Sequence, residues 1–146
     1  FPFPQSWPEA HQKRIQETGA ERFATLGIAR DDEEARREAS KNNYRFFGAP
    51  VLIYACMDRN LSSWSLYDMG SVSQSIMLAA KHYGLDTIPA IMLAAYPDII
   101  REELQIPDDL AVVIGIALGY GDPDNIQNKY TTKRRPLDEF TKFIGF

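Results

Sequence analysis

Apolar and polar positions along the chain predict a series of helices and strands that begins with two helices. The first should run from Trp7 to about Leu26, because Ser6-Trp7-Pro8-Glu9 has the spacing of a capping box and a glycine follows at position 27. Gly19 weakens the middle of this helix. The second should run from Asp31 toward Phe46, since acidic residues suit the positive end of a helix.

Two apolar segments predict strands, and a third segment is interrupted by proline. Val51 to Met57 is rich in β-branched and aromatic residues. Ala111 to Tyr120 is apolar at almost every position, which predicts a central strand covered on both faces. Asp86 to Leu93, which contains Pro89, predicts a short extended piece. Pro97 then opens a helix through Leu104.

The segment from Trp64 to Tyr83 predicts a long helix that ends at Gly84. One apolar stripe should bury Met69, Val72, Ile76, Ala80 and Tyr83. A second face carries the small residues Ser71, Ser75 and Ala79, at a spacing that lets another helix approach closely. Spacing alone leaves two interpretations open: tight packing inside one subunit, or the seam of a dimer.

The order of these elements favours an α+β fold. Helices and strands alternate irregularly, and there are too few strand–helix units for a doubly wound sheet. The 146 residues, 45% of them hydrophobic, are enough for one domain with a sizeable core.

Charge and composition exclude several classes of partner. The formal charge of -4 gives no basic field for nucleic acid or an anionic membrane. No apolar run reaches the roughly 18–20 residues that span a bilayer, and no signal peptide is visible. The single cysteine, Cys56, cannot form an internal disulfide, which fits the cytoplasm. Its apolar neighbours indicate a small core residue.

Few side chains suggest catalysis or metal binding. Gly115, Gly119 and Gly121 follow the order G-x-x-x-G-x-G and precede no helix, so we reject a dinucleotide loop. The two separated histidines, His11 and His82, are poor grounds for a metal site. We interpret them as a solvated residue and a residue that stabilises a helix C-terminus. Asp68 fits a solvated carboxylate better than a base.

Lys133-Arg134-Arg135 is the one cationic cluster near the C-terminus. It is either a solvated basic turn or a phosphate clamp, since arginine presents a planar fork of donors to phosphate oxygens. Residue type alone does not decide between these interpretations.

The order of motifs from about Phe46 to Phe146 resembles the C-terminal part of the FMN-dependent nitroreductase family. Phe47-Gly48-Ala49-Pro50-Val51 is similar to a strand entry of that family, and Trp64 to Tyr83 is similar to its long central helix. Gly84-Leu85-Asp86-Thr87-Ile88-Pro89 resembles the segment that leads to the flavin. Thr132-Lys133-Arg134-Arg135-Pro136 resembles the segment that holds the FMN phosphate.

This resemblance implies a nitroreductase-like three-layer fold, with a mostly antiparallel sheet flanked by helices and the long helix at a homodimer interface. It implies FMN as cofactor and NAD(P)H as co-substrate, with hydride passed in a ping-pong sequence through flavin N5 to a nitroaromatic, quinone or similar small acceptor. By the same resemblance, the flavin ring lies along Pro89, Ala90, Ile91 and Met92, with a backbone N–H near Ile91 facing N5. Arg134 matches the phosphate-binding arginine, with Lys133 beside it. No catalytic side chain and no metal are expected.

The resemblance also has gaps. Segments of the types R-x-S-x-R and P-S-x-x-N-x-Q-P-W, which precede this region in the family, have no counterpart here, and the chain starts at Phe1. We therefore expect a single nitroreductase-like domain that lacks its N-terminal portion. Two alternatives stay open: a non-catalytic truncated paralogue, or a reductive dehalogenase or enone reductase on the same fold.

Overall fold

The central strand of the fold is β3 (Leu110–Gly119), which lies between β1 (Val51–Asp58) and β2 (Asp86–Ala90) in an antiparallel sheet of order β1-β3-β2. The protein is described by a computed structural model that covers residues 6–145. Ile116 in the middle of β3 is fully buried, and Val112 and Ala117 are each 2% exposed. Buried neighbours such as 116 and 117 face opposite sides of a strand, so the prediction of a central strand covered on both faces is confirmed.

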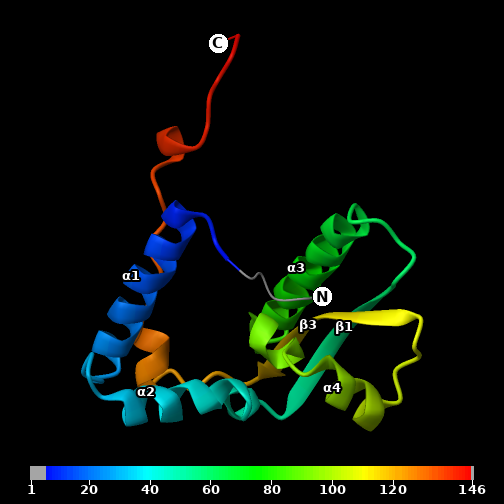
Figure 1. Cartoon of the computed structure of the whole chain (residues 1–146), viewed down its shortest axis with the longest axis horizontal. Coiled ribbons are helices and arrows are strands. Elements are labelled where there is room, and N and C mark those ends of the chain that lie inside the picture. Colours follow the sequence, from blue (N-terminus) through cyan, green and yellow to red (C-terminus); the bar gives the residue numbers. More distant parts are fainter. Residues whose placement is uncertain (1–5, 146) are drawn as a thin grey trace. The chain divides into compact units, whose positions relative to one another are not determined.

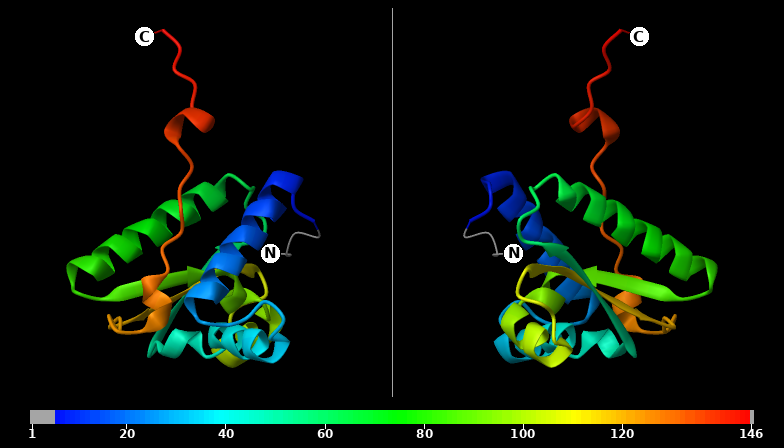
Figure 2. Two further views of the ribbon diagram at one scale, coloured as in Figure 1. Left: turned by 90° about the vertical axis from the view of Figure 1, so that its left-hand side faces the viewer. Right: turned by 90° about the vertical axis from the view of Figure 1, so that its right-hand side faces the viewer.

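Helices cover this sheet. The long helix α3 (Ser65–His82) runs along one face, and the short helix α4 (Pro97–Leu104) lies on the other side, after a 3₁₀ turn, η3 (Ile91–Ala94) (Figures 1 and 2). Together with α2 (Glu33–Ser40), these elements form one compact unit over residues 33–122. Antiparallel strands flanked by helices confirm the predicted α+β, three-layer arrangement.

A second compact unit comprises residues 6–32 and 123–145. It contains α1 (Glu9–Thr25), which is continuous through Gly19, and the 3₁₀ turns η4 (Ile126–Lys129) and η5 (Leu137–Glu139). The guanidinium of Arg22 on α1 donates to Oε1 of Gln127 over 3.3 Å, which ties η4 to the helix.

Two helix boundaries differ from the predictions. The capping box at Ser6 does not form: Pro8 is the N-cap of α1, without a side-chain hydrogen bond, and its carbonyl accepts the N–H groups of His11 and Gln12. Helix α2 ends at Ser40 and not near Phe46, because the Asn43 side chain donates to the Ser40 carbonyl over 2.8 Å and so satisfies the helix end.

The predicted buried stripe of α3 is partly wrong. Val72 and Tyr83 are 52% and 76% exposed. The side that packs on the sheet is rotated from the predicted stripe and consists of buried or half-buried residues, namely Leu66, Met69, Ser73, Ile76, Met77 and Ala80. Ser73 is buried at 8% exposure, because a small residue lets the helix approach the strands closely.

One further boundary in this unit is confirmed, and two expectations hold only in part: the extended piece predicted to reach Leu93 ends at Ala90, where η3 begins, and Cys56 is less buried than expected of a core residue. Helix α3 ends where expected: Gly84 has φ 74°, and the Leu85 N–H donates to the Ala80 carbonyl over 2.9 Å. Cys56 is half-buried in β1, and burial raises the pKa of its thiol. In the described part of the chain, no helix is both long and apolar enough to cross a membrane.

The first prediction concerns Gly115 in β3. A Cβ added there would lie 2.5 Å from Cβ of Leu93 and 3.1 Å from the Tyr54 ring. Overpacking of this kind costs about 1–3 kcal/mol, so Gly115→Ala should lower the free energy of unfolding by that amount in urea titrations. Gly70→Ala is the matched control, because a Cβ at Gly70 on α3 meets nothing within 4 Å. It should be neutral or raise stability by about 0.5–1 kcal/mol. Equal effects of the two substitutions would contradict the packing argument.

Candidate functional site

The 3₁₀ turn η3, which follows β2, is held against the sheet by packing and by one hydrogen bond. Leu93 in η3 is 4% exposed, and its side chain sits where Gly115 has no Cβ. The Tyr54 hydroxyl donates to the Leu93 carbonyl over 3.2 Å, and burial raises the pKa of Tyr54, which keeps it a neutral donor. The turn is therefore held in place by the buried Leu93, which packs against Gly115, and by the hydrogen bond from Tyr54.

The predicted ring-contacting residues lie at the end of β2 and the start of η3. Pro89 is exposed and Ile91 is 53% exposed, while Ala90 and Met92 are half-buried. Among the described residues β2 is an edge strand, where a proline without an N–H is tolerated. The four residues are thus consecutive and apolar and carry no titratable side chain, while Pro89 and Ala90, as neighbours in a strand, face opposite sides of the sheet.

The other end of β2 is held by Asp86. Its Oδ1 lies 2.8 Å from Nζ of Lys81 at the end of α3, and its Oδ2 accepts the Gly121 N–H over 3.2 Å. The hydrogen bond from Lys81 lowers the pKa of the Asp86 carboxyl. A Cβ at Gly121 would require that exposed carboxylate to shift. Gly115 serves the packing of Leu93 and the backbone N–H of Gly121 binds Asp86, which agrees with our rejection of a dinucleotide loop.

The cationic segment of the second unit separates into three different environments. Nζ of Lys133 forms an ion pair with Oε1 of Glu21 on α1 at 2.6 Å. The guanidinium of Arg135 lies over the Phe140 ring, 5.2 Å from its centroid. Arg134 donates to the backbone carbonyls of Thr132 and Lys133 and to the Thr132 hydroxyl. Within residues 6–145, Arg134 has no carboxylate partner, so it keeps its charge available for an anion.

The sequence did not predict several of these interaction partners. Glu21 stands 112 positions before Lys133, and no local pattern connects them. Tyr54 and Asp86 also gave no signal, because their roles depend on strand register. The two predicted sets, residues 89–92 and residues 133–134, belong to different compact units.

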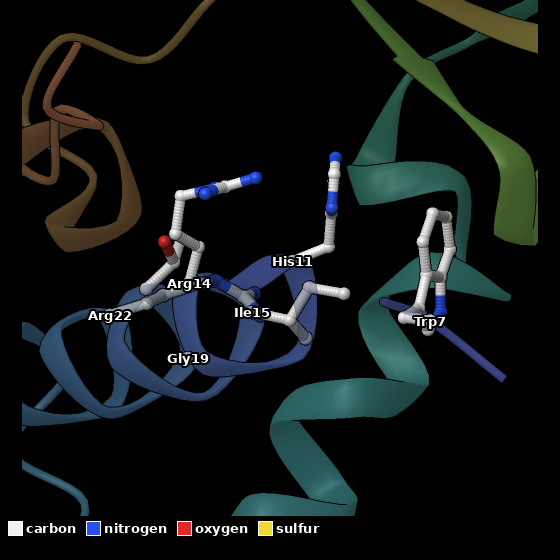
Figure 3. A pocket seen from close by; sticks show the side chains of 7 residues that line it. Trp7, His11, Arg14, Ile15, Gly19 and Arg22 are labelled. Carbon is white, nitrogen blue, oxygen red and sulfur yellow. The ribbon is translucent and has the colours of Figure 1, made fainter. Parts of the chain in front are cut away.

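Helix α1 carries an open groove of about 450 Å³ along one face (Figure 3). Its lining residues all come from α1 and the turn before it, namely Trp7, His11, Arg14, Ile15, Thr18, Gly19 and Arg22. His11, predicted to be solvated, is exposed and borders this groove. No group of three potential metal ligands occurs in the part of the chain that the structure describes.

Comparison with known proteins decides the family. A sequence model of the nitroreductase family matches residues 6–120. The chain belongs to the nitroreductase family. The resemblance that the motif order indicated is therefore confirmed.

Relatives of known activity lie close in sequence. The chain is 37% identical over 142 residues to the nitrobenzene nitroreductase of Ectopseudomonas oleovorans, covering 97% of this chain and 63% of that protein. It is 32% identical to the 4-nitrobenzoate reductase of Pseudomonas putida, covering 98% of this chain and 63% of that protein. The chain thus spans less than two thirds of these relatives.

A solved nitroreductase has the same fold. The FMN and NADPH-dependent nitroreductase NfnB of Sphigopyxis sp. strain HMH superimposes with a TM-score of 0.93 at 34% identity, covering 100% of this chain and 66% of that chain. The FMN-dependent nitroreductase NfnB of Mycobacterium smegmatis, solved with NADPH, gives 0.90 at 30% identity, over 99% of this chain and 65% of that chain. The nitroreductase fold of this member is therefore shown.

The second prediction concerns the pH response of the Glu21–Lys133 pair. The hydrogen bond from Lys133 lowers the pKa of Glu21, and Glu21 raises the pKa of Lys133. Stabilisation from Glu21 is present above the usual glutamate range and is lost as pH falls through the lowered pKa. Stabilisation from Lys133 is present below the usual lysine range and is lost as pH rises through the raised pKa. The pair should therefore persist across neutral pH.

An NMR titration of the glutamate side-chain carboxyls tests this prediction. Lys133→Met should return the Glu21 pKa toward the usual glutamate range, whereas Lys13→Met, on the same helix, should leave it unchanged. An unaltered Glu21 pKa in Lys133→Met would show that the pair does not form in solution.

Proposed function

We propose that the protein is an FMN-dependent oxidoreductase that uses NAD(P)H to reduce nitroaromatic, quinone or similar small acceptors. The observation that carries this proposal is the apolar segment 89–92, whose following residue Leu93 is held against the sheet by Gly115 and Tyr54, in a chain of the nitroreductase family. A flat isoalloxazine ring can stack on apolar atoms of this segment and accept hydrogen bonds from its backbone N–H groups.

Two sets of residues, which belong to different compact units, are proposed to hold the two ends of the cofactor. Pro89, Ala90, Ile91 and Met92 suit the ring, and a backbone N–H near Ile91 would serve N5 without any particular side chain. Arg134, which has no carboxylate partner among the described residues, suits the phosphate. Lys133 already forms an ion pair with Glu21, so we expect it to contribute less to phosphate binding than Arg134 does.

Bound FMN would supply the redox chemistry, by accepting hydride from NAD(P)H at N5 and passing it to the acceptor in a ping-pong sequence. Arg134 would bind the phosphate, and residues 89–92 would orient the ring. This segment contains no acid or base, which is consistent with a reaction that the cofactor carries out.

We also propose a cytoplasmic homodimer with α3 at its interface. Ser71, Ser75 and Ala79 are all exposed on α3. The Ser71 hydroxyl donates to the Tyr67 carbonyl and the Ser75 hydroxyl to the Ser71 carbonyl, each over 2.9 Å. Because the hydroxyls are satisfied within their own helix, a second α3 could pack here without leaving polar groups unpaired.

The third prediction tests the function itself. The protein as its gene encodes it should be yellow when purified, release FMN on denaturation, and oxidise NAD(P)H only when an acceptor such as a nitroaromatic or a quinone is present. Colourless protein that gains no flavin absorbance when FMN is added would favour a non-catalytic paralogue. Bound FMN with turnover only on halogenated aromatics or enones would favour a dehalogenase or an enone reductase.

The fourth prediction separates the two neighbouring arginines. Arg134→Ala should weaken FMN binding by about tenfold or more, because a charge-assisted phosphate contact contributes roughly 1.5–3 kcal/mol. Arg135→Ala is the matched control, since Arg135 stacks on Phe140, and it should change FMN affinity by less than about twofold. Affinity is measured from quenching of free FMN fluorescence. Equal losses in the two variants would refute the assignment of Arg134.

A further inference from the structure

Two tyrosines from separate parts of the sheet unit meet at its surface. The ring centroids of Tyr44 and Tyr96 lie 5.7 Å apart, and the two ring planes are tilted by 49°. This separation falls within the roughly 4.5–7 Å at which aromatic pairs attract each other. A hydrogen bond between the two hydroxyls raises the pKa of Tyr44, so the phenolic oxygens lie at the same end of the pair.

The backbone on the Tyr44 side is held in one conformation. Tyr44 follows the 3₁₀ turn η1 (Lys41–Asn43), and its N–H donates to the first carbonyl of that turn over 2.9 Å. The next turn, η2 (Phe46–Gly48), has positive φ at all three residues. Non-glycine residues keep this conformation only where the surrounding structure fixes them. Pro50 then packs on β3 at Gly119, where a Cβ would lie 2.8 Å from Cδ of the proline.

The backbone on the Tyr96 side is held independently. Tyr96 connects η3 to α4, and its carbonyl accepts the N–H of Ile100 over 3.2 Å in the first turn of that helix. On the other side, η3 is anchored by Leu93, as described above. Both rings also reach solvent, since Tyr44 is 44% and Tyr96 56% exposed. The pair is therefore fixed in position and open to small reagents.

We propose that Tyr44 and Tyr96 form an oxidative modification site, at which a one-electron oxidant, such as a radical formed from peroxide, joins the two rings as dityrosine. Each phenol gives up one electron and its hydroxyl proton, and the two phenoxyl radicals couple through ring carbons next to the oxygens. One C–C bond forms, two aromatic C–H bonds break, and the hydrogens from those bonds restore the two hydroxyls. The net loss is two electrons to the oxidant and two protons to water.

Ring contact distinguishes this pair from tyrosines that are more exposed. Tyr67, Tyr83 and Tyr120 are 79%, 76% and 85% exposed, so an oxidant reaches them more easily. Within residues 6–145, none of these three has another tyrosine as a ring partner. A partner held in contact replaces an encounter between two molecules, which strongly favours coupling. Dityrosine should therefore form inside one chain.

The new bond would close a loop that contains β1, α3, β2 and residues 89–92. A covalent link of this kind restricts the unfolded chain, as a disulfide does, and stabilises the folded state if the native geometry accepts it. Oxidation at this site should therefore raise the urea concentration at which the unit unfolds.

Photochemical oxidation of the protein as its gene encodes it tests the site. Dilute protein is illuminated briefly with ruthenium(II) tris-bipyridyl and persulfate, and each persulfate takes up two electrons to become two sulfates. Dityrosine should appear in chains that migrate as monomers on a denaturing gel. Trypsin should release residues 42–45 joined to residues 82–101, two hydrogen atoms lighter than the separate peptides together. Fragmentation of the joined peptides should place the bond at Tyr96 and not at Tyr83.

Matched variants identify the two partners. Tyr44→Phe and Tyr96→Phe keep the rings and remove the oxidisable hydroxyl. Each should lower the yield of monomeric dityrosine by about tenfold or more, because the remaining phenol has no tyrosine held beside it. Tyr120→Phe is the control: it removes a more exposed phenol without a tyrosine partner, and should change the yield by less than about twofold.

Four results would overturn the proposal. Dityrosine confined to chains that migrate as dimers would mean that exposure decides the coupling. Monomeric dityrosine that persists in Tyr44→Phe would place the bond elsewhere. An equal yield of the joined peptides from urea-unfolded protein would show that the fold does not bring the rings together. A lower urea midpoint for the crosslinked protein would show that the bond distorts the native structure. None of these measurements needs bound FMN, so they test the site independently of the proposed function.

Discussion

The close approach of Leu93 to β3 at Gly115 is the constraint on which the described sheet unit depends. A strand in the middle of a sheet normally presents a side chain at every position, and that side chain keeps any covering segment at a distance. At Gly115 nothing projects, so the turn after β2 packs directly on the strand and the Tyr54 hydroxyl can reach its carbonyl. The position of residues 89–92, which precede Leu93, therefore depends mainly on the missing side chain of Gly115 and less on the hydrogen bond from Tyr54.

Much of this unit is predictable from sequence because its signals are local. The apolar run of β3, the proline that opens α4 and the glycine that follows α3 each act through a few neighbouring residues. The failures have tertiary or side-chain causes. Which face of α3 is buried depends on where the sheet lies, and Val72 is exposed although it fits an apolar stripe. The end of α2 is set by one amide side chain, from Asn43.

The candidate site shows the same division. Residues 89–92 and 133–134 were predicted from the order of family motifs, which a sequence displays directly. Their supporting contacts were not predictable, because Glu21 with Lys133, and Asp86 with Gly121, meet only in the folded chain. These contacts determine which of the predicted residues still has an unpaired charge. Lys133 is neutralised by a carboxylate, and Arg134 beside it is not, so two cations that look equivalent in the sequence differ in what they can still bind.

The proline in β2 has a further consequence for how the protein behaves in a crowded cell. An exposed strand edge offers free N–H and carbonyl groups that can recruit a strand of another molecule and start aggregation. Pro89 lies in such an edge strand of the described sheet, opposite Ile116, and removes one donor from the fourth position of a five-residue strand. An exposed apolar segment in an edge strand would otherwise be a site for unwanted strand pairing. The same residue that borders the proposed flavin surface therefore also protects it from self-association.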